Sequence, residues 1–315
     1  MYDGTKLARA GVVVVTFNYR VGFEGLGHVP GMPENRALLD QIAAFQWVRA
    51  NIAAFGGDPD RVTVFGESAG ATSVVSLLAT PRTEGLFRRA IAQSVAGRAP
   101  LPLADAHRVT GLVADAAGVP ATLEGLRSLR PEQMVALQDV PLAAMAADPD
   151  AWSMPDNVTC FAPVLDGELV ADTPWSVLRT GARRDVDLMT GYTTDEYSLF
   201  AGRRDVPADL AATAKRLGLH EGALAAYRAA DPGTRRPRPV HADVLGPGVP
   251  HALHVGRRGA RDGGRTGVPV RIRLAVTGVV RGGGGPPPPP HKGKGQRSKT
   301  RNSAAGAGLG VVCFI

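Results

Sequence analysis

The chain of 315 residues, 44% of them hydrophobic, has room for one large domain or two small ones. Its two cysteines, Cys160 and Cys313, give neither a disulfide framework nor the spacing of a metal site, and we expect no metal. No apolar stretch is long enough to cross a bilayer, so we expect a cytoplasmic protein without a membrane partner. The net charge of +7 is divided very unevenly along the chain.

The first 233 residues have the pattern of alternating strands and helices. The β-branched run AGVVVVTFNY (10–19) is typical of a strand buried on both faces of a parallel sheet. Asp3 lies among the basic residues before this run, and no small-residue cleavage site follows, so the segment is not expected to be a signal peptide. Residues 34–55 predict a helix that ends at the Gly-Gly-Asp-Pro sequence. Its apolar positions recur every three or four residues, at Leu38, Ile42, Phe45, Val48, Ile52 and Phe55.

Further elements continue this alternation along the chain. We predict a strand over 61–65, a helix over 69–79 and two more strands within 88–95 and 184–192. A helix over 209–230 completes the series. Strand–helix alternation at this spacing indicates an α/β fold, with a mostly parallel sheet and helices on both faces.

The second part, residues 234–315, differs in kind. It has 15 Lys and Arg residues but two Asp and Glu residues, a net charge of +13, whereas residues 1–233 have 21 and 27, a net charge of −6. It contains no Glu, Tyr, Trp or Met, and it includes RGGGGPPPPPHKGKG. Such a segment buries too little apolar surface to offset the entropy lost on ordering. We therefore predict a disordered basic tail; residues 268–280 alternate as a strand does, but no partner for them is evident.

Three interpretations of the tail are open. It could be a basic arm that binds nucleic acid, but it lacks the aromatic side chains on which single-stranded bases stack. It could be a plain solvated tail. The abrupt loss of four residue types with a surge of Arg, Gly and Pro also fits a GC-rich gene read out of frame, and composition favours this interpretation.

The pentapeptide Gly66-Glu67-Ser68-Ala69-Gly70 matches G-x-S-x-G and lies between a predicted strand and a predicted helix. A tight turn at this point forces the serine into a strained backbone conformation and exposes its hydroxyl. The flanking glycines allow the strand and the helix to approach each other. Ser68 is thus the candidate nucleophile, and the N–H of Ala69, at the helix N-terminus, is a candidate oxyanion donor.

The sequence resembles the type-B carboxylesterases, the cholinesterase-like branch of the α/β-hydrolase fold. The resemblance rests on NYRVG (18–22), residues 38–74, LFRRAIAQS (86–94), FAPVLDG (161–167) and GYTTDEYSLF (191–200). It extends from about residue 2 to about residue 232. It implies hydrolysis of small-molecule carboxylic esters by a Ser-Glu-His triad, with an acyl-serine intermediate and no cofactor.

The resemblance also implies roles for particular residues. Glu196 is the candidate acid of the triad, although Thr193 and Tyr197 depart from the family's G-x-N-x-D-E-G segment, and Asp195 could also serve. Glu67 resembles a buried glutamate with a structural role. Arg20 and Asp40 resemble an ion pair that braces the sheet against a helix, the alternative being two surface charges.

Two parts of the family's machinery are not identified. The glycine-rich segment that supplies other oxyanion donors precedes the first strand in the family, and this sequence has no counterpart. No histidine has the family context: His28 and His107 precede the acid, His220 falls in a predicted helix, and the others lie in the tail at His241, His251, His254 and His291. We therefore expect residues 1–233 to be a partial hydrolase domain, weakly active or inactive and poorly soluble.

These observations and the resemblance favour a carboxylic ester hydrolase. A non-catalytic cholinesterase-like binding protein is one alternative, but such a protein has no need of a strained serine. A nucleic-acid-associated protein acting through the tail is the other. The sequence specifies neither the acid and alcohol parts of the substrate nor the oligomeric state.

Overall fold

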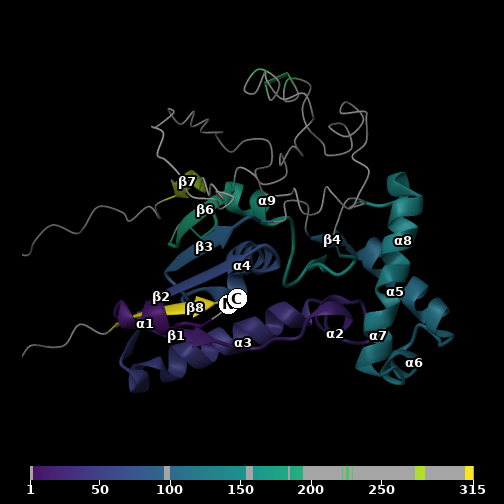
Figure 1. Ribbon diagram of the computed structural model, residues 1–315, viewed down its shortest axis with the longest axis horizontal. Helices are drawn as coiled ribbons and strands as arrows, with labels where there is room; N and C mark the ends of the chain where they lie inside the picture. The colour runs from purple at the N-terminus through teal and green to yellow at the C-terminus, as the bar shows by residue number, and fades with distance from the viewer. Residues whose placement is uncertain are drawn as a thin grey trace, which may run out of the picture.

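A six-stranded sheet organises the computed structural model of the chain (Figure 1). The structure describes residues 3–95, 100–153, 159–183 and 185–193, the backbone of residues 274–280 and 309–314, and four helical positions between 222 and 229. The strands of this sheet follow the order β1-β8-β2-β3-β6-β7, and all neighbours are parallel except β6 and β7. A separate parallel pair is formed by β4 and β5. The strands are β1 (Val12–Thr16), β2 (Gly57–Glu67), β3 (Arg89–Gln93), β4 (Leu101–Pro102), β5 (Val164–Leu165), β6 (Asp187–Thr193), β7 (Leu274–Val280) and β8 (Leu309–Phe314).

The helices alternate with these strands as the sequence predicts. The helix predicted over 34–55 begins at Arg36, ends at Asn51 and continues as a 3₁₀ turn. The helix predicted over 69–79 begins at Ala69 and ends at Ala79, as predicted. The described helices are α1 (Thr5–Arg9), α2 (Gly22–Leu26), α3 (Arg36–Asn51), α4 (Ala69–Ala79), α5 (Leu103–Ala117), α6 (Leu123–Arg127), α7 (Pro131–Leu137), α8 (Asp139–Ala147) and α9 (Pro174–Arg179), with 3₁₀ turns η1 (Ile52–Phe55), η2 (Pro81–Thr83) and η3 (Pro149–Ala151). In this part of the chain, none of them combines the length and the apolar character that crossing a membrane requires.

The main hydrophobic core lies where α3 and α4 pack on the sheet. Side chains of α3, β2, α4 and β3 form one buried cluster, and α4 contacts both β2 and β3. Five of the six apolar positions that recur in residues 34–55 are buried there. The exception is Phe55, which is 62% exposed. Phe55 belongs to η1, whose tighter 3₁₀ winding departs from the period of 3.6 residues.

A second cluster lies among helices α5 to α8, which Figure 1 shows grouped beside α2 at one side of the molecule. Phe23 of α2 meets Phe161 edge-to-face, with their ring centroids 5.8 Å apart. Arg108 of α5 lies over the ring of Trp152 at 4.0 Å. The first contact joins α2 to the segment that leads into β5, and the second joins α5 to the residue that follows η3.

Two segments of the predicted tail are strands of the main sheet. Residues 274–280 form β7, which pairs with β6, so the expectation that they lack a partner is wrong. Residues 309–314 form β8, which lies between β1 and β2 (Figure 1). The expectation of disorder does not hold for these two segments, and the rest of 234–315 lies outside the described residues.

The predicted ion pair between Arg20 and Asp40 is present, which confirms the pairing. Two guanidinium nitrogens of Arg20 donate to the two carboxylate oxygens at 2.8 and 2.7 Å, and the backbone N–H of Arg20 donates at 3.0 Å. The side chains are 45% and 26% exposed, so the pair joins the segment after β1 to α3 at the surface rather than in the core. The hydrogen bonds from Arg20 lower the pKa of Asp40 below its ordinary value of 3.8.

We expect Asp40→Asn to lower the free energy of unfolding at pH 7 by about 1 kcal/mol, because an exposed pair is worth this much at most. A carboxylate whose pKa is lowered by folding stabilises the protein above its ordinary pKa, and this contribution is lost as the pH falls through the lowered value. Urea unfolding should therefore show a difference between variant and parent that shrinks below pH 3.8. Asp60→Asn is the control, since Asp60 pairs with Arg49 but is 76% exposed. An equal loss in both variants would contradict the assignment.

Candidate active site

Ser68 forms the turn between β2 and α4. Its backbone has φ 55° and ψ −115°, a conformation that residues with a side chain rarely adopt. Such a conformation costs about 1–3 kcal/mol and persists only where the surrounding structure enforces it. The residue is exposed, as expected for a hydroxyl that a sharp turn raises above the sheet. The geometry predicted from Gly66–Gly70 is therefore present.

Backbone hydrogen bonds fix Ser68 on both sides. Its N–H donates to the carbonyl of Gln93, the last residue of β3, at 2.9 Å. Its carbonyl accepts from the N–H of Thr72 at 2.9 Å and from the hydroxyl of Thr72 at 3.2 Å. The first bond anchors the turn to the neighbouring strand, and the other two begin α4. The conformation of Ser68 is thus enforced by two elements at once.

Gly66 is required because the strand and the helix nearly touch. A Cβ atom on Gly66 would lie 2.5 Å from the carbonyl carbon of Gly70 and 2.6 Å from its oxygen. Both contacts are with backbone atoms of the first turn of α4, which cannot move aside as a flexible side chain can. This close approach explains the glycine two residues before the serine.

The amino end of α4 lies directly beyond Ser68. Ala69 is the first helical residue and is exposed, and the N–H groups of the first turn have no acceptor within the helix. These dipoles favour negative charge at this end of the helix. The segment that follows is almost entirely buried, from Gly70 to Leu78, so the helix axis is firmly held.

The carboxyl end of β6 lies at the same edge of the sheet as Ser68. The register aligns Glu67 of β2 with Gln93 of β3 and Gln93 with Gly191 of β6. Two strand spacings of about 4.8 Å place β2 and β6 about 10 Å apart. β6 ends at Thr193, and the candidate acid Glu196, like Asp195, lies outside the described residues.

Ser94 repeats the behaviour of Ser68 one strand away, which sequence analysis did not anticipate. It follows β3, has φ 56°, and donates its N–H to the carbonyl of Gly191 at 2.8 Å. Adjacent strands therefore end in the same way, each tied to the next strand by the first residue beyond it. The sequence offers no glycine signal at Ser94 that could have revealed this.

Glu67 is exposed, so the expectation of a buried glutamate is wrong. It is the last residue of β2 and lies at the carboxyl edge of the sheet. Successive side chains along a strand alternate between the two faces of the sheet. Glu67 occupies the position before Ser68, and its carboxylate remains in contact with water.

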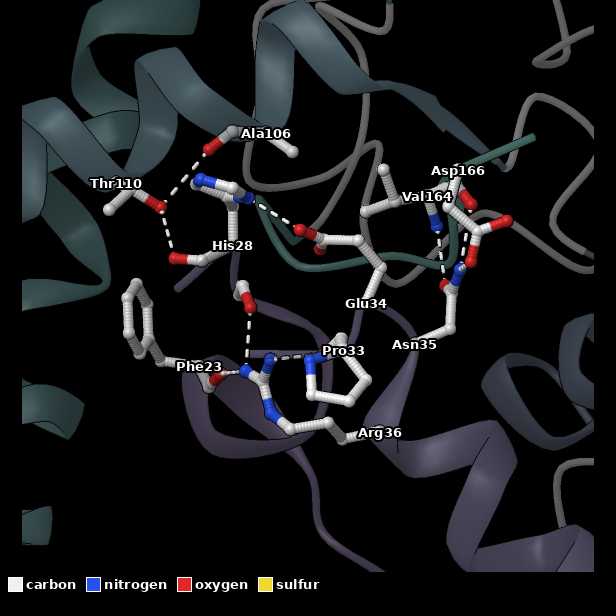
Figure 2. Close-up of polar contacts among 11 residues, drawn as sticks. Phe23, His28, Pro33, Glu34, Asn35, Arg36, Ala106, Thr110, Val164 and Asp166 are labelled. Atoms are coloured by element: carbon white, nitrogen blue, oxygen red, sulfur yellow. Dashed lines mark hydrogen bonds and ion pairs between the residues drawn. The ribbon is translucent and has the colours of Figure 1, made fainter. Parts of the chain in front are cut away.

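The described histidines contact each other: His28 precedes α3, and His107 belongs to α5. Nδ1 of His28 lies 2.5 Å from Oε1 of Glu34 (Figure 2). The ring of His28 stacks on that of His107 with centroids 3.9 Å apart. The carbonyl of His28 accepts from the hydroxyl of Thr110 at 2.8 Å, which ties this loop to α5. His28 is thus engaged in a structural contact, while His220, His241, His251, His254 and His291 lie outside the described residues.

Asn35 and Arg36, which follow Glu34, fix the start of α3, and sequence analysis did not identify them. Asn35 has φ 54° and is 1% exposed, and its amide bonds both the N–H and the C=O of Val164 at 2.7 and 2.8 Å (Figure 2). It also donates to Asp166 at 2.8 Å. The buried guanidinium of Arg36 donates to four carbonyls in and beside α2, those of Phe23, Glu24, Gly27 and Pro33. Burial lowers the pKa of Arg36.

Metal binding finds no support among the described residues, which contain no group of three or more His, Cys, Asp and Glu side chains that could hold an ion. Cys160 is 2% exposed, and its burial raises the pKa of the thiol to about 12. The serine turn itself presents the Ser68 hydroxyl beside the N-terminus of α4.

Comparison with known proteins identifies the class. The sequence model of the carboxylesterase family matches residues 1–219. The chain belongs to the carboxylesterase family, and its fold is that of the α/β-hydrolase esterases.

Individual relatives are esterases that are much longer than this chain. It is similar to the para-nitrobenzyl esterase of Bacillus subtilis (strain 168), with 40% identity over 209 residues that cover 64% of this chain and 40% of that enzyme. The fumonisin B1 esterase of Sphingopyxis macrogoltabida is 37% identical over 215 residues, covering 65% of this chain and 37% of that enzyme. A solved structure of a PNB esterase aligns with a TM-score of 0.55 and 34% identity, over 70% of this chain and 46% of that one. The chain thus spans less than half the length of these relatives.

We expect Gly66→Ala to disrupt the serine turn. The added Cβ would collide with the backbone of Gly70, and overpacking of this kind costs about 1–3 kcal/mol. Urea unfolding should show this loss. Gly111→Ala in α5 is the control, because a Cβ there meets nothing within 4 Å and alanine favours a helix by about 1 kcal/mol over glycine. Equal stability of the two variants would show that the strand and helix are not in close contact.

Proposed function

We propose that Ser68 is the nucleophile of a carboxylic ester hydrolase that acts on small-molecule esters. The observation that carries this proposal is the strained backbone of Ser68 between β2 and the amino end of α4. Strain at one serine, held by the hydrogen bonds to Gln93 and Thr72, has no purpose in packing, because the side chain is exposed. The esterase activity of the relatives supports the same reaction class.

The reaction proceeds in two halves. The hydroxyl oxygen of Ser68 attacks the ester carbonyl carbon while its proton passes to a histidine, and the carbonyl oxygen becomes an oxyanion facing the N–H of Ala69. The carbon–alkoxide bond then breaks, the alcohol leaves with the proton, and an acyl-serine remains. Water attacks the acyl carbon in the second half by the same proton path, which releases the acid and restores the serine hydroxyl.

Glu196 is the proposed acid that orients this histidine. The register supports the position, since β6 ends three residues earlier at Thr193 and at the same sheet edge as Ser68. A carboxylate in the loop after β6 starts about 10 Å from β2, and one imidazole ring between acid and serine fills such a distance. Asp195 is the neighbouring alternative.

Labelling with a fluorophosphonate probe tests the nucleophile without a choice of substrate. We expect slow labelling of the full chain, because no histidine of the sequence has the family's context and a poorly placed general base activates the serine hydroxyl weakly. Ser68→Ala should abolish labelling, since the probe bonds to the activated hydroxyl. Ser94→Ala is the matched control, as Ser94 has nearly the same backbone φ on the next strand. Folded protein, verified by circular dichroism, that does not label would overturn the proposed function for this chain.

The acid is tested by comparing Glu196→Gln with Asp195→Asn. An amide cannot stabilise the imidazolium that forms during attack, so the correct substitution should slow labelling at least about tenfold. We expect this loss for Glu196→Gln and less than about a twofold change for Asp195→Asn. The reverse result would transfer the role to Asp195, and no change in either variant would remove the acid from this loop.

A further inference from the structure

β8 is the last strand in the sequence but occupies an interior position in the sheet. Gly310 to Phe314 pair in parallel with Val12 to Thr16 of β1, and β8 also pairs in parallel with β2. Within the described residues, β1 pairs with β8 alone, so β8 is its link to the rest of the sheet. Without β8, two strands would face each other across an empty position with unpaired N–H and C=O groups.

The strand adjoins the element that carries Ser68. Phe314 is the register partner of Phe65, three residues before the serine. β2 is held on its other side by β3, and Ser68 itself is tied to the end of β3. One side of the serine-bearing strand therefore depends on β8 for its backbone hydrogen bonds.

The connection to β8 is far longer than the distance it covers. The end of β7 and the start of β8 lie at the same edge of the sheet, because β7 runs antiparallel to β6. They are four strand positions apart, about 19 Å. The intervening residues 281–308 number 28 and could extend to about 95 Å. The length of the connection therefore places no constraint on the position of β8.

We propose that the position between β1 and β2 is a binding site for one extended apolar segment, that its occupant is the chain's own residues 309–314, and that the Ser68 turn depends on this occupancy. The sequence LGVVCF is uncharged and rich in β-branched residues, as a strand with neighbours on both sides requires. Backbone pairing supplies the affinity, as in other cases of strand addition to a sheet. The dependence of the turn is structural, and only its activity readout rests on the proposed function.

Cross-linking tests the occupant in the full chain. Cys313 is the register partner of Val15, whereas Val14 partners residue 312. Paired strands lie about 4.8 Å apart, within disulfide range, and neighbouring positions on a strand project to opposite faces. Mild oxidation of Val15→Cys should give an intramolecular disulfide with Cys313, mapped by mass spectrometry, and Val14→Cys should not. Cys160 is buried and remains protonated at neutral pH.

Two results of this experiment would overturn the proposal. Failure of Val15→Cys to cross-link would remove β8 from its position. A disulfide-linked dimer as the main product at micromolar protein would show that the occupant is a second copy. Neither result depends on esterase activity, so this experiment judges the strand site even if the proposed function fails.

Removal and replacement of the strand test its consequence. A chain that ends at residue 308 should lose its cooperative thermal transition and its labelling at Ser68. A synthetic peptide of residues 308–315 with Cys313→Ser should restore the transition and the labelling saturably, and a scrambled peptide should not. If the shortened chain melts as the parent does, the sheet does not need β8. A shortened chain that melts as the parent does but fails to label would show that the Ser68 turn depends on β8 although the stability of the sheet does not.

Discussion

The close approach of β2 and α4 is the constraint on which the rest of the described structure depends. The chain passes from strand to helix through one residue, and the backbone of Gly66 then faces that of Gly70 with no room for a side chain. The strain at Ser68 costs about 1–3 kcal/mol. Each fully buried Val or Leu contributes about 1.5–3 kcal/mol, and α4 buries Val74, Leu77 and Leu78 against the sheet and α3. The free energy gained by packing α4 therefore exceeds the free-energy cost of the strain and keeps Ser68 in its conformation.

The parallel sheet brings the residues that follow several strands together at one edge. In a parallel sheet every strand ends on the same side, so the residues after β2, β3 and β6 are neighbours although they are far apart in sequence. Ser68 and Ser94 are both fixed there by an N–H that reaches the next strand. Hydrogen bonds between the strand ends thus tie Ser68 and Ser94 to the neighbouring strands at this edge.

Much of this arrangement could be predicted from the sequence, because local rules determine it. The helices α3 and α4, the strands β2 and β3 and the turn at Ser68 follow from apolar periodicity, glycine placement and a motif with a steric cause. The contacts of Asn35 with Val164 and Asp166 could not be predicted, since they join residues about 130 positions apart through a buried amide. The exposure of Glu67 was missed because the family resemblance carries no information on the burial of one side chain in this chain.

The strands of the basic segment were missed for a different reason. Composition averages over a long segment, and a hexapeptide such as residues 309–314 is hidden within Gly, Pro and Arg residues. Pairing then depends on a complementary position in the sheet, which no local pattern reveals. The same limit applies to β7, whose alternation was visible but whose partner β6 lies about 80 residues earlier.

The place of β8 also has a consequence for synthesis of the chain. Residues 12–16 and 310–314 are paired, so almost the whole sequence must be made before β1 acquires the neighbour that joins it to the sheet. At about 5–20 residues per second, a ribosome needs about 15–60 s to cover that interval. Throughout this time β1 and β2 present open, apolar strand edges to the cell, and such edges readily pair with other chains. The yield of folded protein therefore depends on the time for which these edges stay open, as well as on the stability of the finished sheet.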